Sequence, residues 1–261
     1  MILFKKIKKR ETKVKILRFK KLDSTNTYAK KLAIEGESEK TVIVANEQTA
    51  GRGRLGRTFL SKRGGLYFSV ILRPDIKAEE TVFLTVAAAV AAARAIEHIS
   101  DQKCDIKWVN DIYINNKKVC GILTEGNFNS QKKLDFAVLG VGINLFAPKG
   151  GFPANLPLAG CVFNKNKPFL EKSITKKLLN KFLSEFYDIY DNFNDKSFVK
   201  EYAARSFLTD KEITYTKDGL PYRARVVGID DNANLVVSRD GKSEKLSHGE
   251  IQITGMEQLS V

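Results

Sequence analysis

The sequence is poor in the residue types that build metal centres and nucleophilic triads. Its 261 residues include two histidines and three cysteines. The cysteines, Cys104, Cys120 and Cys161, are widely spaced and form no CxxC pair, so we expect buried, reduced thiols and no zinc site. Only His98 and His248 could serve a histidine-based metal centre or a Ser/His/Asp triad, and neither is expected. Any catalysis would therefore depend on other groups.

Long apolar runs are also missing. The basic stretch 1–10 is not followed by an uninterrupted apolar segment, so the sequence has no recognisable secretory signal and predicts an intracellular, cytoplasmic protein. The uncharged stretch Thr81–Ala93 is rich in alanine and is too short to cross a bilayer. We interpret it as part of a buried helix over Thr81–Ile99 and expect no membrane attachment.

Positive charge is concentrated at the N-terminus. Residues 1–21 carry ten Lys/Arg against Glu11 and supply +9 of the formal net charge of +14, so the rest of the chain is only mildly basic. A basic arm can bind nucleic acid or steer an acidic partner, and a solvated edge segment explains the same pattern. Only Phe4 and Phe19 could stack on bases among these charges, which disfavours a basic nucleic-acid-binding module.

Apolar periodicity divides the chain into two parts. Strands alternate with helices up to residue 207, with strands at 14–22, 41–45, 65–73, 105–114, 119–126 and 135–146, and helices at 27–36, 81–99, 174–186 and 198–207. After Asp210, short strands are separated by turn residues at 217–219, 230–232 and 239–241, which is typical of a small β-barrel. The pattern predicts a large domain over 1–207, with a basic extension over 1–12, and a small C-terminal domain over 208–261.

The loop Gly51–Arg57 (GRGRLGR) satisfies the dinucleotide pattern GxGxxG. That fingerprint needs a helix directly after the glycines, whereas here a segment of strand character follows. Interleaved arginines and glycines are instead typical of a mobile loop whose amides and guanidinium groups close on phosphate or carboxylate oxygens. A flexible surface loop with a basic face is the alternative.

The segment 105–114 reads as one strand, with Lys107, Val109 and Asp111 on the same face. The lysine and the aspartate could form an exposed ion pair, or could share an anionic ligand and its metal ion. The Asn115-Asn116 pair predicts a tight hairpin turn, since asparagine tolerates positive φ. Lys118 then lies at the rim of the sheet, where a side chain can reach an adjacent cleft.

Small polar residues precede the first helix. Ser24, Thr25 and Asn26 could cap that helix, but one cap needs only one of them. With Gln48 at the end of the next strand, they could bind a planar, urea-like group. Farther along, glycines in the segment Gly140–Asn144 could let a nucleotide base approach the backbone, although a strand glycine also marks a bulge.

The order and spacing of several motifs resemble those of the biotin protein ligases over nearly the whole chain. These motifs are DSTN, NEQTAGRGRLGR, KWVND followed by KKVCGILTE, and GVGIN. The resemblance implies an α+β fold, with a mixed sheet flanked by helices as in the catalytic domains of class II aminoacyl-tRNA synthetases, and a small C-terminal SH3-like β-barrel. It implies an ATP-dependent ligase that forms biotinyl-5'-adenylate and transfers biotin to a lysine of a carboxylase's biotin carboxyl carrier domain. ATP and biotin would be substrates, with Mg²⁺.

The same resemblance assigns roles to individual residues. The biotin site would comprise Ser24, Thr25, Asn26, Gln48, Arg52, Gly53, Arg54 and Lys118. The ATP site would comprise Arg54, Arg57, Lys107, Asn110, Asp111 and Asn144, with Asp111 as the Mg²⁺ ligand. Lys118, Arg54 and Asp111 would be the catalytic residues.

Three positions depart from the family pattern: Val109 stands where proline is usual, Leu55 where arginine is frequent, and Phe59 where tryptophan is frequent. Family members that repress transcription carry an N-terminal helix-turn-helix domain. Only about a dozen residues precede the first predicted strand, so specific DNA binding is not expected.

Two questions stay open at this level. A ligase for lipoate or octanoate would share the activation chemistry, although the polar set around Ser24 and Gln48 favours a ureido head over an alkyl or dithiolane tail. The sequence also allows a homodimer without requiring one.

Overall fold

A seven-stranded sheet forms the centre of the larger part of the protein. The computed structural model describes residues 14–129, 131, 133–164, 168–247, 249 and 251–253. Strand order in the sheet is β1-β2-β3-β7-β6-β5-β4, with β1 and β2 parallel and every other neighbouring pair antiparallel. This confirms the predicted mixed sheet of an α+β fold. The strands are β1 (Lys15–Phe19), β2 (Thr41–Ala45), β3 (Gly65–Leu72), β4 (Asp105–Lys107), β5 (Asp111–Ile114), β6 (Lys117–Phe128) and β7 (Leu134–Asn144).

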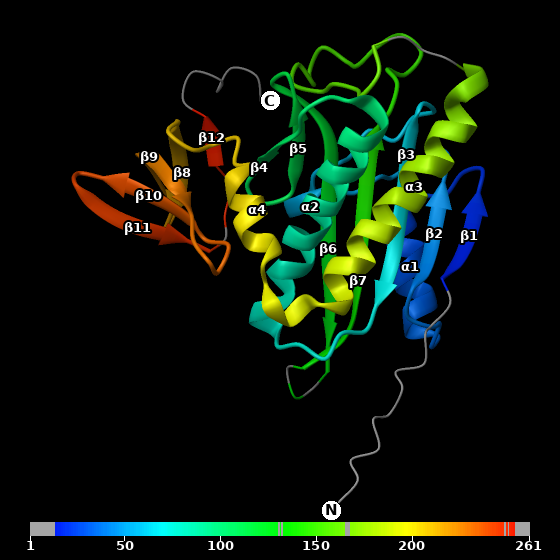
Figure 1. Cartoon of the computed structure of the whole chain (residues 1–261), viewed down its shortest axis with the longest axis horizontal. Helices are drawn as coiled ribbons and strands as arrows, with labels where there is room; N and C mark the ends of the chain where they lie inside the picture. Colours follow the sequence, from blue (N-terminus) through cyan, green and yellow to red (C-terminus); the bar gives the residue numbers. More distant parts are fainter. Residues whose placement is uncertain are drawn as a thin grey trace, which may run out of the picture.

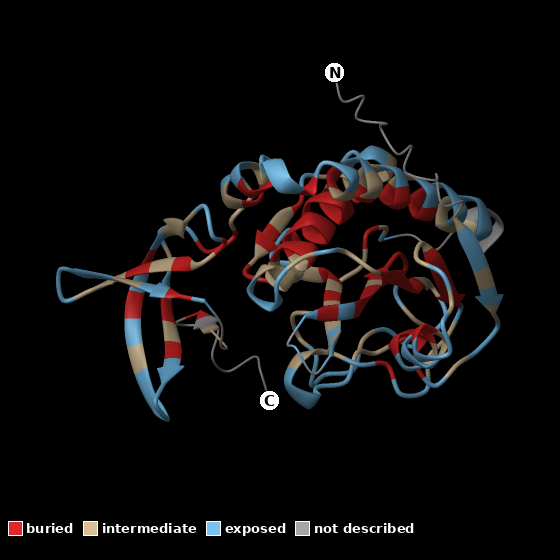
Figure 2. Cartoon of the chain, turned by 90° about the horizontal axis from the view of Figure 1, so that it is seen from below, coloured by how far each residue is buried: buried red, intermediate tan, exposed pale blue. Residues whose placement is uncertain are grey.

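Helices cover both faces of this sheet (Figure 1). On one face, α1 (Thr25–Ile34) packs against β2, β3 and β7. On the other face lie α2 (Thr81–Ser100), α3 (Pro168–Asp191) and α4 (Phe198–Ala204). Figure 2 shows buried residues concentrated where the helices meet the sheet. Single 3₁₀ turns occur at η1 (Arg54–Gly56), η2 (Ala78–Glu80) and η3 (Phe193–Asp195).

The alanine-rich helix α2 is longer than the weakly charged stretch that predicts it. Its alanines let α3 and the sheet approach closely, and the run from Val86 to Ala93 is fully buried. Among the described residues, one helical segment, Ala78–Ser100, is long and apolar enough to cross a membrane by length and composition. Inside the protein, 72% of its apolar window is buried, as in a core helix, which confirms the predicted buried helix.

The segment 105–114 is not one strand. Its residues form β4 and β5, which run antiparallel and are joined by the turn Trp108–Asn110. Lys107 and Asp111 are therefore partners across this hairpin and share a face as predicted, whereas the continuous strand between them was wrong. The Trp108–Val109 peptide is cis. The turn is held from outside, because Tyr202 Oη donates to the Val109 carbonyl (3.0 Å) and Trp108 Nε1 donates to the Ala233 carbonyl (2.9 Å).

A five-stranded antiparallel sheet follows α4, with strand order β11-β10-β9-β8-β12. Positive φ values at Asp218 and Gly219, and again at Asp240 and Gly241, confirm two of the predicted tight turns. The predicted boundary near residue 208 falls between α4 and β8 and stays a prediction. The strands are β8 (Glu212–Lys217), β9 (Leu220–Ile229), β10 (Leu235–Arg239), β11 (Lys242–Leu246) and β12 (Ile251–Ile253).

The cysteines are free thiols. Cys104 and Cys120 are buried and Cys161 is half-buried. Burial raises the pKa of the Cys104 thiol to about 12 and that of Cys120 well above its usual value, so both are protonated and unreactive near neutral pH. The basic segment 1–12, His248 and the C-terminal residues 254–261 lie outside the described residues.

Candidate active site

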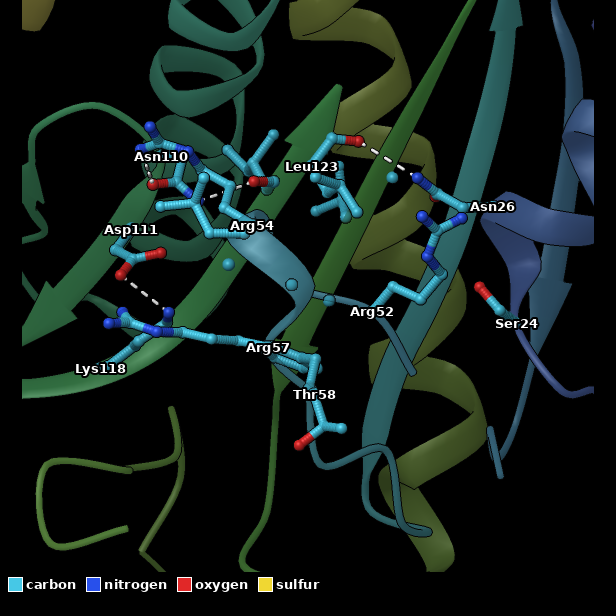
Figure 3. Close-up of a pocket in the computed structure, with 18 of the residues that line it drawn as sticks. Ser24, Asn26, Arg52, Arg54, Arg57, Thr58, Asn110, Asp111, Lys118 and Leu123 are labelled. Carbon is cyan, nitrogen blue, oxygen red and sulfur yellow. Dashed lines mark hydrogen bonds and ion pairs between the residues drawn. The ribbon is translucent and has the colours of Figure 1, made fainter. Parts of the chain in front are cut away.

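One pocket brings together nearly all of the predicted site residues. It opens where α1 begins, beside β6 and β7, and the GRGRLGR loop forms one wall (Figure 3). Every residue predicted for biotin or ATP lines it except Asn144. Residues that the sequence singled out at separations of nearly one hundred positions therefore meet in a single cavity.

One end of the pocket is a hydrogen-bonded group of polar, uncharged side chains. Ser24 is the N-cap of α1, and its Oγ accepts from the Thr27 amide at 3.4 Å, which leaves its own hydroxyl proton for another acceptor. The Gln48 Oε1 accepts from the Thr25 amide (2.7 Å) and from Thr25 Oγ1 (3.0 Å). Gln48 Nε2 donates to Ser61 Oγ at 2.7 Å. Capping thus accounts for Ser24, while Thr25 and Gln48 fix each other at the pocket wall.

Asn26 is held in one orientation at the same end. Its Oδ1 accepts from the buried Ser69 hydroxyl (2.6 Å) and its Nδ2 donates to Glu125 Oε2 (2.9 Å). Because an ionised carboxylate only accepts, the amide nitrogen must face Glu125. Gly140 makes this position possible, since a Cβ there would lie 2.0 Å from Asn26 Oδ1. The first glycine of GVGIN therefore makes room for Asn26.

The GRGRLGR loop is a compact hairpin. Arg52 and Thr58 form a β-bridge, and the Gly53 amide donates to the Arg57 carbonyl at 2.7 Å. The chain reverses at Leu55 and Gly56, both at positive φ. Arg52 Nη2 lies 3.0 Å from Glu125 Oε1, next to the polar end. Arg54 points toward the opposite end, where it donates to Asn110 Oδ1 (3.2 Å) and to the Gly249 carbonyl (3.4 Å). The two arginines therefore serve different ends of the pocket.

Phe59, which ends the loop, lies against the sheet at two glycines. Gly121 and Gly142 are partners across β6 and β7, and a Cβ would lie 2.9 Å and 2.5 Å, respectively, from the Phe59 ring. The glycines thus form a flat floor for an aromatic ring of this chain. The interpretation that glycines of the segment Gly140–Asn144 admit a nucleotide base stays a prediction.

We expect Gly142→Ala to displace Phe59 and to destabilise the protein. Overpacking by one methyl group lowers the free energy of unfolding by about 1–3 kcal/mol. The lower end of this range applies here, because the Phe59 ring is only half-buried and can shift. Urea unfolding followed by circular dichroism measures this change. Gly228→Ala is the matched control, since Gly228 also lies in a strand but a Cβ there would meet nothing within 4 Å beyond its chain neighbours. Equal stability of the two variants would contradict the proposed floor.

The other end of the pocket is cationic. Four basic side chains, Arg54, Arg57, Lys107 and Lys118, line it with a single carboxylate, Asp111. Lys118 Nζ lies 2.7 Å from Asp111 Oδ2, as Figure 3 shows. The second carboxylate oxygen, Asp111 Oδ1, is buried without a hydrogen-bond partner. Asn110 is fixed by donation from Nδ2 to the Ile122 carbonyl at 2.8 Å.

Asn144 lies outside this pocket. It is buried at the end of β7, and its Nδ2 donates to the Gly160 carbonyl at 3.0 Å, so it ties β7 to the following loop. The resemblance carried this residue into the ATP site because it closes the GVGIN motif, and that role stays a prediction.

Several residues near the site escaped the sequence interpretation. Gly249 and Ile251, from the C-terminal part, line the pocket, and Ser61, Ser69 and Glu125 support its polar end. A signal existed for Glu125, because alternation along β6 puts it on the same face as Gly121 and Leu123, which line the pocket. No local pattern marks Gly249 or Ile251, since the C-terminal segment reaches the site only through tertiary packing.

Comparison with known proteins places these residues in a family. The model of the biotin/lipoate A/B protein ligase family matches residues 18–144. The bifunctional ligase/repressor BirA of Bacillus subtilis is 44% identical over 136 residues, covering 52% of this chain and 42% of that protein. The biotin–[acetyl-CoA-carboxylase] ligase of Paracoccus denitrificans is 38% identical over 132 residues, covering 49% of this chain and 54% of that protein. The chain thus spans about half the length of these curated relatives.

Structural similarity extends over almost the whole chain. The biotin protein ligase from Aquifex aeolicus, solved in complex with biotin and ATP, superposes with a TM-score of 0.72 at 26% identity and covers 92% of this chain and 98% of that one. Residues 18–144, which match the family model, include the N-cap of α1, the GRGRLGR loop and the glycines of β6 and β7 under Phe59. Residues 18–144 thus match the biotin/lipoate A/B protein ligase family, and the chain as a whole has the fold of a solved biotin protein ligase.

Proposed function

We propose that this protein activates biotin with ATP as biotinyl-5'-adenylate and transfers the biotinyl group to a lysine of an acceptor protein. The supporting observation is the charge distribution within the pocket. Its polar end is neutral overall, since Arg52 is paired with Glu125, whereas its other end carries four basic side chains against Asp111. Biotin has the matching form, with an uncharged ureido ring at one end and a carboxylate at the other.

Recognition of the ureido ring would rest on Ser24, Thr25, Asn26 and Gln48. A urea presents one carbonyl acceptor and two N–H donors, so it needs donors and acceptors fixed close together. The bonds among Thr25, Gln48 and Asn26 fix these groups before a ligand enters, which reduces the entropy lost on binding. An octanoyl chain or a dithiolane ring offers no partner for them, so their burial under such a tail would be costly.

Adenylation would occur at the cationic end. An oxygen of the biotin carboxylate attacks the α-phosphorus of ATP, the bond to the β-phosphate oxygen breaks, and pyrophosphate leaves with the electron pair. Both reactants are anions, so fixed cations that neutralise the crowded transition state supply most of the catalysis. Lys118 would hold the carboxylate, with Arg54, Arg57, Lys107 and Asn110 around the phosphates. In the second step the acceptor lysine amine attacks the acyl carbon, and AMP leaves.

Asp111 fits a role as the Mg²⁺ ligand. Among the described residues, no group of three or more His, Cys, Asp or Glu side chains could hold a metal by itself. Mg²⁺ commonly uses only one or two carboxylates together with substrate phosphates, and the buried Asp111 Oδ1 lacks any other partner. The ion, when bound with ATP, supplies charge neutralisation at the phosphates. Asp111 holds it and orients Lys118 through its other oxygen.

The partner and setting follow from the same proposal. The acceptor would be the biotin carboxyl carrier domain of a biotin-dependent carboxylase such as acetyl-CoA carboxylase, met in the cytoplasm. We also propose that the C-terminal sheet, β8 to β12, belongs to a separate SH3-like barrel domain over 208–261 that contributes Gly249 and Ile251 to the catalytic domain's pocket. A homodimer, the absence of membrane attachment and the lack of specific DNA binding stay predictions.

We expect biotin, and neither lipoate nor octanoate, to stimulate ATP–pyrophosphate exchange. The purified protein would be incubated with labelled pyrophosphate, ATP, Mg²⁺ and each acid in turn, because exchange reports adenylation without an acceptor. A second incubation with biotin, ATP and a biotinoyl carrier domain, analysed by mass spectrometry, tests transfer to the lysine. Exchange that responds to lipoate alone would overturn the biotin assignment in favour of the related acyl ligases.

A further inference from the structure

Glu125 connects the two elements that enclose the polar end of the pocket. It lies on β6 and does not line the cavity, and its side chain is 21% exposed. One carboxylate oxygen accepts from Asn26 Nδ2 at 2.9 Å, and the other lies 3.0 Å from Arg52 Nη2. A single side chain therefore joins the first turn of α1 to the arginine loop.

The bond to Asn26 makes Glu125 part of a continuous polar chain. From Gln48 the chain runs through Thr25 and the buried Ser69 hydroxyl to Asn26, and from there to the carboxylate. Glu125 is the one charged member of this chain, and Arg52 meets it from the loop side. Glu125 thus links Arg52 to the side chains that would bind the ligand's head group.

The geometry points to Glu125 as a positioning residue, a latch that holds Arg52 and its loop over the polar end of the pocket and slows release of an uncharged head group. This inference rests on the proposed function, since the head group is taken as the biotin ureido ring. In Figure 3 the Arg52 guanidinium extends across the pocket toward Asn26 and Ser24. Arg52 is 47% exposed and its loop partners are backbone groups, so the carboxylate is the charge that orients it.

Glu125→Gln isolates the charge from the packing. Glutamine has the same size and keeps a carbonyl oxygen for Asn26, but it loses the ionic attraction to Arg52. We expect biotin to leave Glu125→Gln roughly 2- to 5-fold faster than the parent protein, the upper range for a partly exposed charged pair. The KM for biotin in pyrophosphate exchange should rise, with a smaller change in kcat, because Glu125 touches no reacting atom.

A double-mutant cycle with Arg52→Ala tests whether the effect passes through the arginine. If Glu125 acts as a latch, Arg52→Ala/Glu125→Gln releases biotin no faster than Arg52→Ala alone. Glu47→Gln is the matched control, since it removes a comparable pair with Arg63 (2.9 Å), and neither Glu47 nor Arg63 lines the pocket. Control and parent should release biotin at the same rate.

Two failures are separable. If the parent protein neither binds biotin nor exchanges pyrophosphate with it, the proposed function is wrong. If the parent does both, while Glu125→Gln releases biotin at the parental rate or the two substitutions act additively, the latch is overturned and the proposed function stands. Stopped-flow release of biotin, with the fold of each variant checked by thermal melting, gives all of these outcomes.

Discussion

Lys118→Ala should lose adenylation by about 10²- to 10³-fold, the scale of losing one charged stabiliser of a developing anion in a closed site. Lys118 Nζ is 2.7 Å from Asp111 Oδ2 at the cationic end, where the carboxylate and the α-phosphate must meet. The variant should stay folded, because the lysine side chain is one-third exposed at the rim of the sheet. Pyrophosphate exchange measures the loss, and transfer from preformed biotinyl adenylate should fall much less.

The neighbouring lysine supplies the control for that experiment. Lys117 precedes Lys118 on β6, is exposed, and donates from Nζ to the Pro157 carbonyl at 2.6 Å outside the pocket. Lys117→Ala should exchange pyrophosphate normally. Near-normal exchange by a folded Lys118→Ala variant would mean that Lys118 is not a catalytic residue.

Local patterns predicted the elements with strong periodicity. The apolar run Thr41–Ala45 is β2 with those bounds, and the apolar spacing from Ile174 to Phe186 lies within α3. The Asn115-Asn116 turn has both residues at positive φ, as expected for a tight hairpin. These features succeed because the chemistry that produces them lies within a few residues of the chain.

The hairpin β4–β5 is an element that local sequence patterns did not predict. Its turn, Trp108–Asn110, contains neither glycine nor proline, and the period-two pattern continues through the reversal. The turn is held by Tyr202 and Ala233, each separated from it by about ninety residues or more. No window of the sequence contains those partners, so the reversal could not be read from it.

For the site, the sequence predicted which residue types come together but not the directions of their side chains. Residue types and motif order identified the pocket's two ends, with Ser24 and Gln48 at one and Lys118 and Asp111 at the other. They did not show that Arg52 and Arg54 point to opposite ends or that Asn144 bonds to the Gly160 carbonyl. Side-chain direction depends on the loop's turn at Leu55 and on partners such as Glu125, which are properties of the folded chain.

Arg54→Ala should still form biotinyl adenylate but retain it poorly. Arg54 ties the loop to the turn after β4 through Asn110 and to the C-terminal segment through the Gly249 carbonyl. When the adenylate is bound, the same guanidinium would also face its phosphate. A bond to a charged group contributes roughly 1.5–3 kcal/mol, so its loss should speed release of the adenylate by about ten- to a hundredfold.

Escaped adenylate acylates any accessible amine, so the Arg54→Ala reaction should label lysines of bystander proteins. Incubation with biotin, ATP and an unrelated protein such as albumin, followed by detection of biotin on that protein, measures the escape. Arg63→Ala, which removes an exposed arginine outside the pocket, should leave bystanders unlabelled. Because Arg54 serves the cationic end and Arg52 the polar end, Arg52→Ala should weaken binding of biotin alone, whereas Arg54→Ala should change it little. Adenylate that escapes from Arg54→Ala no faster than from the parent would mean that the loop does not close the site.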